Sequence, residues 1–444
     1  MSAPRPRHRA RTPPVVASGA RAPALSFPGG LTPAGFMRRY WQKRPLLLRA
    51  ALPPDCAPLS AAELFELAAQ DTVESRLVRG TQETRGASGT SGTSGTSGTP
   101  HKPGTPPARP GRWSLAHGPF ATLPLRSRQP WTLLVQGVNL HHDRADALLR
   151  RFDFISNARL DDLMISYASD GGGVGPHFDS YDVFLIQVAG QRRWRLSAHC
   201  PPTLVPGLPL RILADFRAEE EWVLEPGDIL YLPPHYAHEG TAIGPCMTAS
   251  VGFRAQALAE TAGAFLHDIA DRLDLTGRYA DPGRAVTRNP GRIDDHLIDS
   301  LAASLAKVRW GRADLTEFLT RHLSEPKPRV VFDPPAHRLT AARFARAGGQ
   351  QGLRLTRSST LLYRGSLFAI NGEPVLEPVT EMRPGPGPCA LLRRLADARR
   401  LAAGDCRTAL ADPTLLAILH DWHEAGWLEL GAEPATPATA EPRP

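Results

Sequence analysis

The sequence is poor in several residue types, and each shortage excludes a class of protein. Its five cysteines are scattered and contain no CxxC pair. That spacing excludes a disulfide framework and a zinc finger as simple interpretations, and it favours a reducing, cytoplasmic location. No run of about eighteen apolar residues occurs, so we expect no transmembrane helix and no membrane partner.

Lysine is nearly absent. Arginine supplies 48 of the 52 basic residues, since the only lysines are Lys43, Lys102, Lys307 and Lys327. The formal net charge is +8 and the isoelectric point is about 9.6. The arginine bias, together with abundant Ala and Pro, is typical of a GC-rich coding background. We therefore expect a solvated basic surface and predict no specific nucleic-acid site. A positive electrostatic field would nevertheless favour a protein that acts near RNA.

Three stretches lack the composition of a folded core. Residues 1–26 contain no acid and several prolines that oppose an amphipathic transit helix, so a disordered tail is predicted. Residues 86–110 contain a Ser-Gly-Thr repeat, which predicts a flexible and dispensable insert. Residues 431–444 are rich in Pro and Ala and are predicted to be a second disordered tail.

The segment 27–256 is predicted to be an α+β domain in which small helices precede many strands. Thr32 before Pro33 has the pattern of a helix N-cap, and Ser60 with Glu63 forms a capping box. Short β-rich runs follow at 131–138, 163–168, 183–188, 193–196, 222–224, 229–232 and 247–253. Many short strands separated by Gly and Pro turns are typical of a double-sheet jelly roll, the cupin or double-stranded β-helix architecture.

The character of the chain changes after Arg254. Apolar residues recur at helical spacing over 257–325, in more stripes than a short segment can bury on the barrel alone. We therefore predict a helical dimerisation segment there. Over 326–430, the sequence predicts a hairpin at 361–370 followed by two helical stretches, and this arrangement resembles a winged-helix domain.

The stretch at residues 171–196 contains most of the candidate site residues, and its sequence is GGGVGPHFDSYDVFLIQVAGQRRWRL. Its His177 and Asp179 alternate on a strand and so point the same way. A second stretch, EPGDILYLPPHYAHEG, offers His235 and His238. We choose His238, because His235 lies in a proline turn whereas His238 follows where the chain re-enters a strand. Two imidazoles and one carboxylate leave three metal positions open, as in non-haem Fe(II) oxygenases.

Such a metal centre needs an electron-rich cosubstrate to activate O2. 2-Oxoglutarate chelates a metal through its keto oxygen and one carboxylate, and its far carboxylate then needs a cation in the barrel. Arg192 shares its strand parity with Trp194 and Leu196, whereas Arg193 has the opposite parity. The apolar parity is the inward one, so Arg192 is predicted to hold that carboxylate bidentately.

Two further polar residues are candidates for the same site. Ser166 lies in an apolar strand, where its hydroxyl could donate to 2-oxoglutarate or bond to nearby backbone. Asp170 shares the parity of Ser166 and could bind a cationic substrate at the mouth, although a plain turn aspartate is the alternative. Asp182 is a second candidate acid, but its parity with Phe184 and Ile186 is expected to bury it.

Several motifs resemble the JmjC-type bacterial ribosomal oxygenases: GGGVGPHFDSYDVFLIQ, GQRRWRL, EPGDILYLPP, HEG and SVGFR, together with YWQKRPLLLR at 40–49 and SRLV at 75–78. The resemblance covers about 27–430. It implies a JmjC cupin domain, a homodimer formed by the helical segment, and a winged-helix domain. It implies Fe(II), 2-oxoglutarate and O2 as cofactors, and 3-hydroxylation of an arginine in a 50S ribosomal protein, number sixteen of the large subunit.

The resemblance also implies residue roles. The family's metal ligands correspond to His177, Asp179 and His238, and its 2-oxoglutarate contacts correspond to Arg192 and Ser166. Two alternatives stay open. One is a related oxygenase that hydroxylates a histidine of another ribosomal protein, which would need no acid at the mouth. The other is a catalytically silent cupin that binds RNA or ribosomes, which would form no succinate.

Overall fold

The computed structural model describes residues 31–80, 113–273, 275–375 and 387–431. The predicted insert 86–110, the tail 1–26 and all but the first residue of the tail 431–444 lie outside these residues. The chain divides into two compact units, 1–255 and 256–444, which are described separately. Within the described ranges, no helix is long and apolar enough to cross a membrane.

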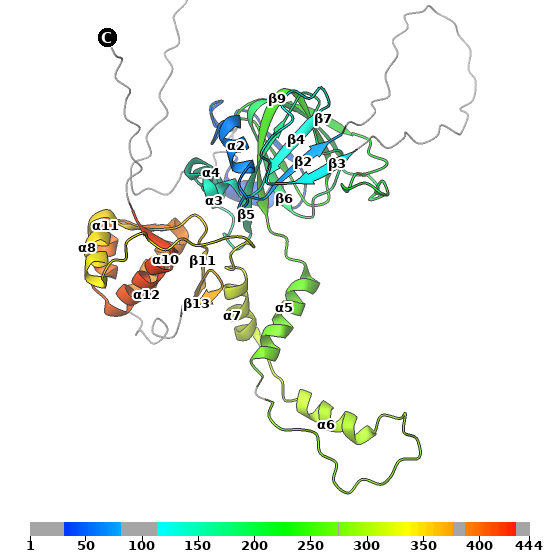
Figure 1. Cartoon of the computed structure of the whole chain (residues 1–444), viewed down its shortest axis with the longest axis vertical. Helices are drawn as coiled ribbons and strands as arrows, with labels where there is room; N and C mark the ends of the chain where they lie inside the picture. The colour runs from blue at the N-terminus through cyan, green and yellow to red at the C-terminus, as the bar shows by residue number, and fades with distance from the viewer. Residues whose placement is uncertain (1–30, 81–112, 274, 376–386, 432–444) are drawn as a thin grey trace, which may run out of the picture. The chain divides into compact units, whose positions relative to one another are not determined.

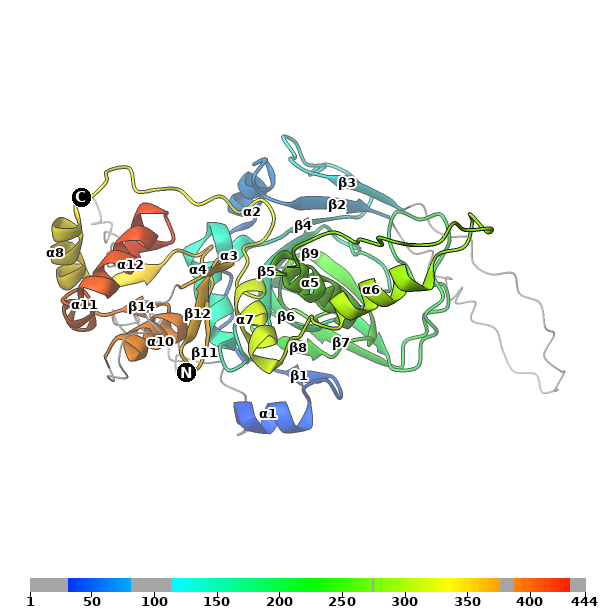
Figure 2. The same cartoon turned by 90° about the horizontal axis from the view of Figure 1, so that it is seen from below.

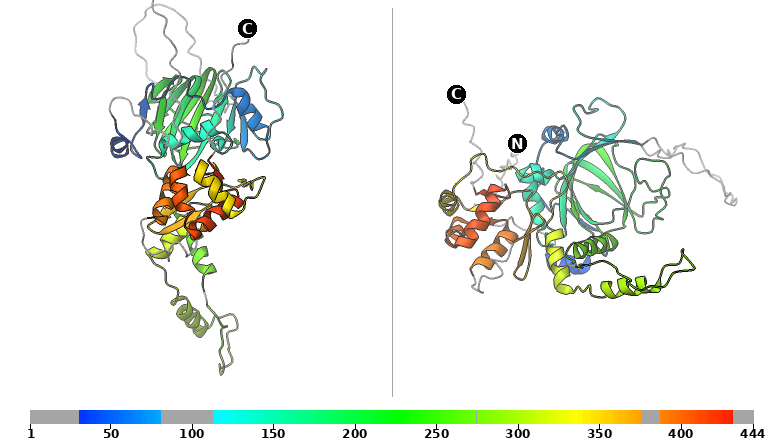
Figure 3. Two further views of the ribbon diagram at one scale, coloured as in Figure 1. Left: turned by 90° about the vertical axis from the view of Figure 1, so that its left-hand side faces the viewer. Right: turned by 60° about the horizontal axis from the view of Figure 1, so that its bottom comes forward.

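The first unit is built on a nine-stranded antiparallel sheet that curves into a barrel (Figure 1; Figure 3, right). The strands are β1 (Leu46–Leu48), β2 (Ser75–Arg79), β3 (Ser114–His117), β4 (Trp131–Val135), β5 (Leu160–Ala168), β6 (Asp182–Ser197), β7 (Glu220–Leu224), β8 (Ile229–Leu232) and β9 (Ala237–Phe253). Their order is β1-β8-β6-β9-β5-β4-β2-β3, with β7 paired to β6. The predicted cupin architecture is confirmed.

The barrel is dominated by two strands that are longer than predicted. The predicted runs 183–188 and 193–196 form the single strand β6, and the run 247–253 is the end of β9. β6 turns a corner at Gly190, whose φ is +60° and whose Cβ position would lie 2.3 Å from the carbonyl oxygen of Pro245. Only glycine fits this approach. In the sequence, the corner is indistinguishable from a turn between two strands.

The corner in β6 also changes which residues face inward. Register shifts relative to β9 occur between Gln187 and Gln191. Val183 and Leu185 before the corner share one buried cluster with Trp194 and Leu196 after it. Odd-numbered side chains therefore face the barrel interior before the corner, and even-numbered side chains face it after the corner. Arg192, which follows the corner, therefore faces inward.

The outer face of the sheet is covered by α1 (Pro33–Arg39), α2 (Ala61–Ala68), α3 (Val138–His141) and α4 (Asp143–Leu149). Figure 2 shows α3 and α4 beside β5. The predicted caps are confirmed: Thr32 Oγ1 accepts a hydrogen bond from Gly35 N at 3.0 Å, and Ser60 and Glu63 form a reciprocal capping box. Buried Phe36 joins these helices to the sheet through Phe184 and Tyr231.

The second unit begins with three helices, α5 (Leu258–Asp271), α6 (Asp295–Leu305) and α7 (Arg312–His322). The remaining elements are α8 (Ala341–Gln351), β10 (Leu353–Leu355), β11 (Leu361–Arg364), β12 (Leu367–Ile370), β13 (Glu373–Pro374), α10 (Pro388–Ala398), β14 (Arg400–Leu401), α11 (Ala403–Ala409), α12 (Pro413–Glu424) and β15 (Leu428–Leu430). The predicted β11–β12 hairpin is present. Gly426, with a φ of +75°, follows the last helix, where a left-handed residue is common.

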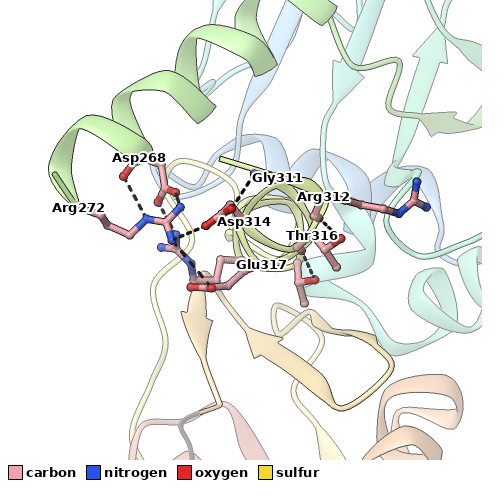
Figure 4. A network of polar contacts seen from close by, with 9 residues as sticks. Asp268, Arg272, Gly311, Arg312, Asp314, Thr316 and Glu317 are labelled. Atoms are coloured by element: carbon pink, nitrogen blue, oxygen red, sulfur yellow. Dashed lines mark hydrogen bonds and ion pairs between the residues drawn. The ribbon is translucent and has the colours of Figure 1, made fainter. Parts of the chain in front are cut away.

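Ion pairs and a small apolar cluster join α5 to α7 (Figure 4). Asp268 of α5 accepts hydrogen bonds from Arg272, at 2.8 Å, and from Arg321 of α7. Arg272 also lies 3.9 Å from Asp314 and 4.0 Å from Glu317. These contacts hold α5 and α7 together, whereas α6 has no buried residue.

Candidate active site

His177, Asp179 and His238 meet inside the barrel. The backbone amides of His177 and His238 each donate to the other residue's carbonyl oxygen at 3.0 Å, which fixes the two residues side by side. His235 N donates to Asp179 O at 2.8 Å. One ligand atom from each of the three side chains lies within 4.8 Å of the others. The group can therefore hold one metal ion with two nitrogens and one carboxylate oxygen.

Backbone carbonyls orient both imidazole rings for metal binding. His177 Nδ1 lies 2.9 Å from Gly175 O, and His238 Nδ1 lies 2.9 Å from Tyr236 O. Each Nδ1 donates its proton there, so the Nε2 lone pairs face Asp179, at 3.9 Å from His177 and 3.5 Å from His238. Burial, and then the neighbouring His177, lower the pKa of His238 to about 4. The His238 imidazole is consequently neutral near pH 7, as a metal ligand must be.

The glycines before His177 form a tightly packed wedge between two strands. A Cβ at Gly172 would lie 2.5 Å from the carbonyl oxygen of Trp131, and one at Gly173 would lie 2.5 Å from that of Gly240. Gly171 N donates to Ala242 O, and Ala242 N donates to Gly172 O. These contacts with β4 and β9 fix the position of the segment that carries His177.

Arg192 is buried, with 5% of its surface exposed, and it points into the barrel. Its Nη1 donates to Ser166 Oγ at 3.2 Å, and Ser166 Oγ donates to Thr248 O at 3.3 Å. Arg192 Nε and Nη2 have no hydrogen-bond partner among the described residues. Leaving a buried donor unpaired costs about 1–3 kcal/mol, so these two atoms fit a bound carboxylate. Arg193 instead forms an exposed pair with Glu221 at 3.1 Å.

Two residues that the sequence analysis set aside, His235 for the metal and Asp182 for the substrate, lie outside the metal group. His235 is exposed and has a left-handed φ of +61°, within the turn before β9. Asp182 is fully buried, as expected from its parity. It accepts hydrogen bonds from Tyr231 Oη at 2.6 Å and Gln42 Nε2 at 2.9 Å.

Asp170 lies on the far side of Arg192 from the histidines. Along β9, His238 is opposite Leu196, Ala242 is opposite Arg192, and Gly244 N donates to Asp170 Oδ1 at 2.7 Å. Six residues of strand separate His238 from Gly244, or roughly 20 Å at about 3.3 Å per residue. Asp170 is exposed, and one of its oxygens supports this turn.

The inner face of β5 continues past Ser166 toward Asp179. Met164, which is half-buried, lies opposite Ser250, and Asp162 lies further along β5, within the register shift between Leu160 and Leu163. Tyr181 is 39% exposed. Burial raises the pKa of its phenol, and the charges of Asp179, Asp162 and Asp161 raise it further.

We define Asp162, Met164, Tyr181 and Ser250 as the mouth of the site. The sequence analysis missed this group. Asp162, Ser166 and Asp170 share one parity, so parity alone could have proposed Asp162 but could not distinguish it from Asp170.

Two family models match the chain. Residues 147–261 match the JmjC domain, and residues 306–429 match the ROXA-like winged helix. The first match and the barrel together define a JmjC-type dioxygenase. The second match begins inside the predicted helical segment, so the boundary between that segment and the winged-helix domain stays a proposal.

Individual relatives narrow the class. The chain is 33% identical over 394 residues to the ribosomal protein uL16 3-hydroxylase of Escherichia coli (strain K12), covering 86% of this chain and 94% of that protein. It is 31% identical over 300 residues to a probable ribosomal oxygenase of Haemophilus influenzae, covering 63% of this chain and 67% of that protein. The chain belongs to the family of JmjC ribosomal oxygenases, as its motifs predicted.

Solved structures agree with this assignment. A structure of YcfD, a ribosomal oxygenase from Escherichia coli, in complex with cobalt and 2-oxoglutarate has a TM-score of 0.70 and 31% sequence identity. It covers 91% of this chain and 99% of that chain. An X-ray structure of the same protein has a TM-score of 0.72 and covers 90% of this chain and 98% of that one.

Proposed function

We propose that this protein is an Fe(II)- and 2-oxoglutarate-dependent hydroxylase that adds a 3-hydroxyl group to an arginine of ribosomal protein uL16. The observation that carries the proposal is the His177–Asp179–His238 group beside Arg192, whose two buried donors lack partners. The name of the Escherichia coli relative supports uL16 as the substrate. The cobalt and 2-oxoglutarate bound to YcfD support a divalent metal ion and 2-oxoglutarate as the cofactors.

Each residue has a role that follows from its contacts. His177, Asp179 and His238 would hold Fe(II) and leave three positions open. Fe(II) and 2-oxoglutarate, when bound, activate O2 and supply one oxygen atom to a substrate C–H bond, with release of succinate and carbon dioxide. Arg192 would bind the far carboxylate through Nε and Nη2, and Ser166 would hold the guanidinium in place. Buried Trp194 and Leu196 exclude water from this part of the barrel.

The purified enzyme tests this proposal with a uL16 peptide. We expect succinate to form in proportion to a peptide product that is heavier by one oxygen atom, only when Fe(II), 2-oxoglutarate and O2 are all present. Failure to form succinate would support the silent-cupin alternative. Oxygen addition to a histidine peptide, and not to the arginine peptide, would favour the histidine hydroxylase alternative.

We propose Asp162 as the acid that binds the substrate guanidinium, in place of the sequence-based candidate Asp170. Asp162 lies on the Asp179 side of Ser166, and its charge acts on the phenol of Tyr181; a guanidinium can pair with a carboxylate and stack on an aromatic ring. Asp162 Oδ2 already accepts from Gly137 N at 3.0 Å, so an amide oxygen in its place would preserve that contact.

Asp162→Asn is expected to raise the KM for the arginine peptide by about tenfold or more, since a hydrogen bond to a charged group contributes about 1.5–3 kcal/mol. Turnover of 2-oxoglutarate without peptide should persist. Asp170→Asn is the matched control and should change the KM less than twofold. Steady-state kinetics with varied peptide would decide, and a larger effect at Asp170 would restore the sequence-based assignment.

We also propose that the helical segment forms a homodimer. α6 has no buried residue, and its Ile298, Leu301 and Leu305 are each at least half exposed along one stripe of the helix. Leu266 of α5 is 57% exposed. An apolar stripe at this spacing is typical of a surface that another helix covers, and a second copy of the chain would cover it.

Leu301→Asp is expected to convert the dimer to monomers, because a charge in an apolar interface lacks a partner. Ala303→Asp, on the opposite side of α6, is the control and should remain dimeric. Light scattering coupled to size-exclusion chromatography measures both. A monomeric unmutated protein would end this proposal, and insoluble Leu301→Asp protein would show that the stripe is core.

A cytoplasmic location follows from the proposed substrate, because ribosomal proteins are made and assembled in the cytoplasm. All five cysteines are free thiols, which agrees with a reducing compartment. For the alternative of RNA binding through the winged helix, α12 offers no phosphate contact from Arg or Lys, because it contains neither.

A further inference from the structure

The end of α1 and the turn after it form an exposed basic patch. We define the α1 patch as Arg38, Arg39, Lys43 and Arg44, all of which are exposed. The first acid of the chain is Asp55, so no carboxylate lies nearby in sequence. Within the part of the chain that the structure describes, none of the four side chains forms an ion pair, so four positive charges remain uncompensated within seven residues.

Two of the four side chains in the α1 patch are held by contacts with their surroundings. Lys43 Nζ donates to Arg38 O at 2.6 Å, and the Arg44 guanidinium lies 4.7 Å from the centroid of the Tyr40 ring. The turn is anchored to the barrel, because Gln42 N donates to Tyr231 Oη at 2.7 Å. Ordered cations lose less conformational entropy on binding than free ones do, which favours a ligand.

The α1 patch is connected to the start of β6, the strand that follows the mouth residue Tyr181. Gln42 Nε2 donates to Asp182 at 2.9 Å, and Asp182 directly follows the mouth residue Tyr181. Two further cations lie in this area, but each is paired with a carboxylate: Arg159 lies 3.4 Å from Asp182, and Arg254 lies 3.4 Å from Asp161. The uncompensated positive charge on this side of the barrel is therefore that of the α1 patch.

We propose that the α1 patch binds the phosphates of RNA. Resting on the proposed function, the enzyme would then act on its ribosomal protein while that protein is bound to RNA. A basic patch repels the basic surface that RNA-binding ribosomal proteins present, but it attracts the polyanion that such a protein carries. Arginine suits phosphate, because its planar guanidinium can make two parallel hydrogen bonds to the oxygens. An RNA-binding α1 patch differs from the purely solvated basic surface that the composition predicts.

Fluorescence anisotropy with a labelled RNA hairpin of mixed sequence tests the proposal on the full-length protein. The triple variant Arg38→Gln/Arg39→Gln/Lys43→Gln should bind at least tenfold more weakly at low salt. The plot of log binding constant against log salt concentration has a negative slope, and its magnitude should decrease by about 2 in the triple variant. Each lost phosphate contact contributes about 0.7 to that magnitude for single strands and about 0.9 for duplexes. The control Arg126→Gln/Arg128→Gln, in an exposed loop of the same unit, should bind less than twofold more weakly.

Two outcomes would overturn the proposal: no saturable RNA binding by the unmutated protein, or equal weakening in the control, which would show general attraction to a chain of charge +8. Arg38→Gln/Arg39→Gln retains Lys43 and its contact with Arg38 O, so it gives the answer if the triple variant melts at a lower temperature. Hydroxylation of the free peptide should be unchanged in the triple variant. Because the RNA assay needs no turnover, it stays informative even if the proposed hydroxylase activity fails.

Discussion

Replacing His177, Asp179 or His238 with alanine is expected to abolish both iron binding and turnover. Each side chain supplies one of the three proposed protein ligands, and the remaining two would leave the ion mostly bound to water. The fold should survive, because the backbone hydrogen bonds between His177 and His238 do not depend on the side chains. Iron content after anaerobic reconstitution, measured beside the melting temperature, separates loss of metal from loss of fold.

His235→Ala is the matched control for this series. The exposed His235 lies in the turn two residues before Ala237, where β9 begins, and it is not one of the three residues that could hold the metal. Its variant should keep iron and activity near those of the unmutated protein. Loss of iron in His235→Ala, with retention in His238→Ala, would reverse the assignment of the third ligand.

Arg192→Ala is expected to raise the 2-oxoglutarate requirement by ten- to a hundredfold. A charge-assisted bidentate contact to a buried carboxylate contributes roughly 1.5–3 kcal/mol, and no other described cation is placed to replace it. Arg193→Ala should have little effect, because Arg193 pairs with Glu221 at the surface.

The Arg192 prediction also has a readout that needs no catalysis. In the presence of Mn(II), 2-oxoglutarate should raise the melting temperature of the unmutated protein and of Arg193→Ala, but much less that of Arg192→Ala. Equal shifts in all three proteins would mean that the far carboxylate binds elsewhere and that the unpaired donors of Arg192 have another partner.

Much of this site could be predicted because side-chain alternation is a local property. The H-x-D spacing places His177 and Asp179 on one face of an extended chain, and apolar neighbours identify the inward face that Arg192 shares with Trp194. The structure brings these residues into one barrel. The cupin fold was predictable for a similar reason, because β-strands and turns can both be recognised from a few consecutive residues.

What the sequence could not supply is position along the barrel. Asp162 and Asp170 have the same parity on either side of Ser166, and only the pairing of β9 with β5 and β6 shows which of them lies toward Asp179. Strand pairing joins residues far apart in sequence, so no local pattern records it. The glycine wedge at 171–173 was missed for the same reason, since its close contacts are with Trp131 and Gly240.

Mass spectrometry of the large-subunit ribosomal proteins from a deletion strain tests the central claim most directly. The account predicts that uL16 from this strain lacks the mass of one oxygen atom on a single arginine. Restoring the unmutated gene should return that mass, and the His177→Ala gene should not. An unchanged uL16 in the deletion strain, with the missing oxygen on a histidine of another ribosomal protein or on none, would contradict it.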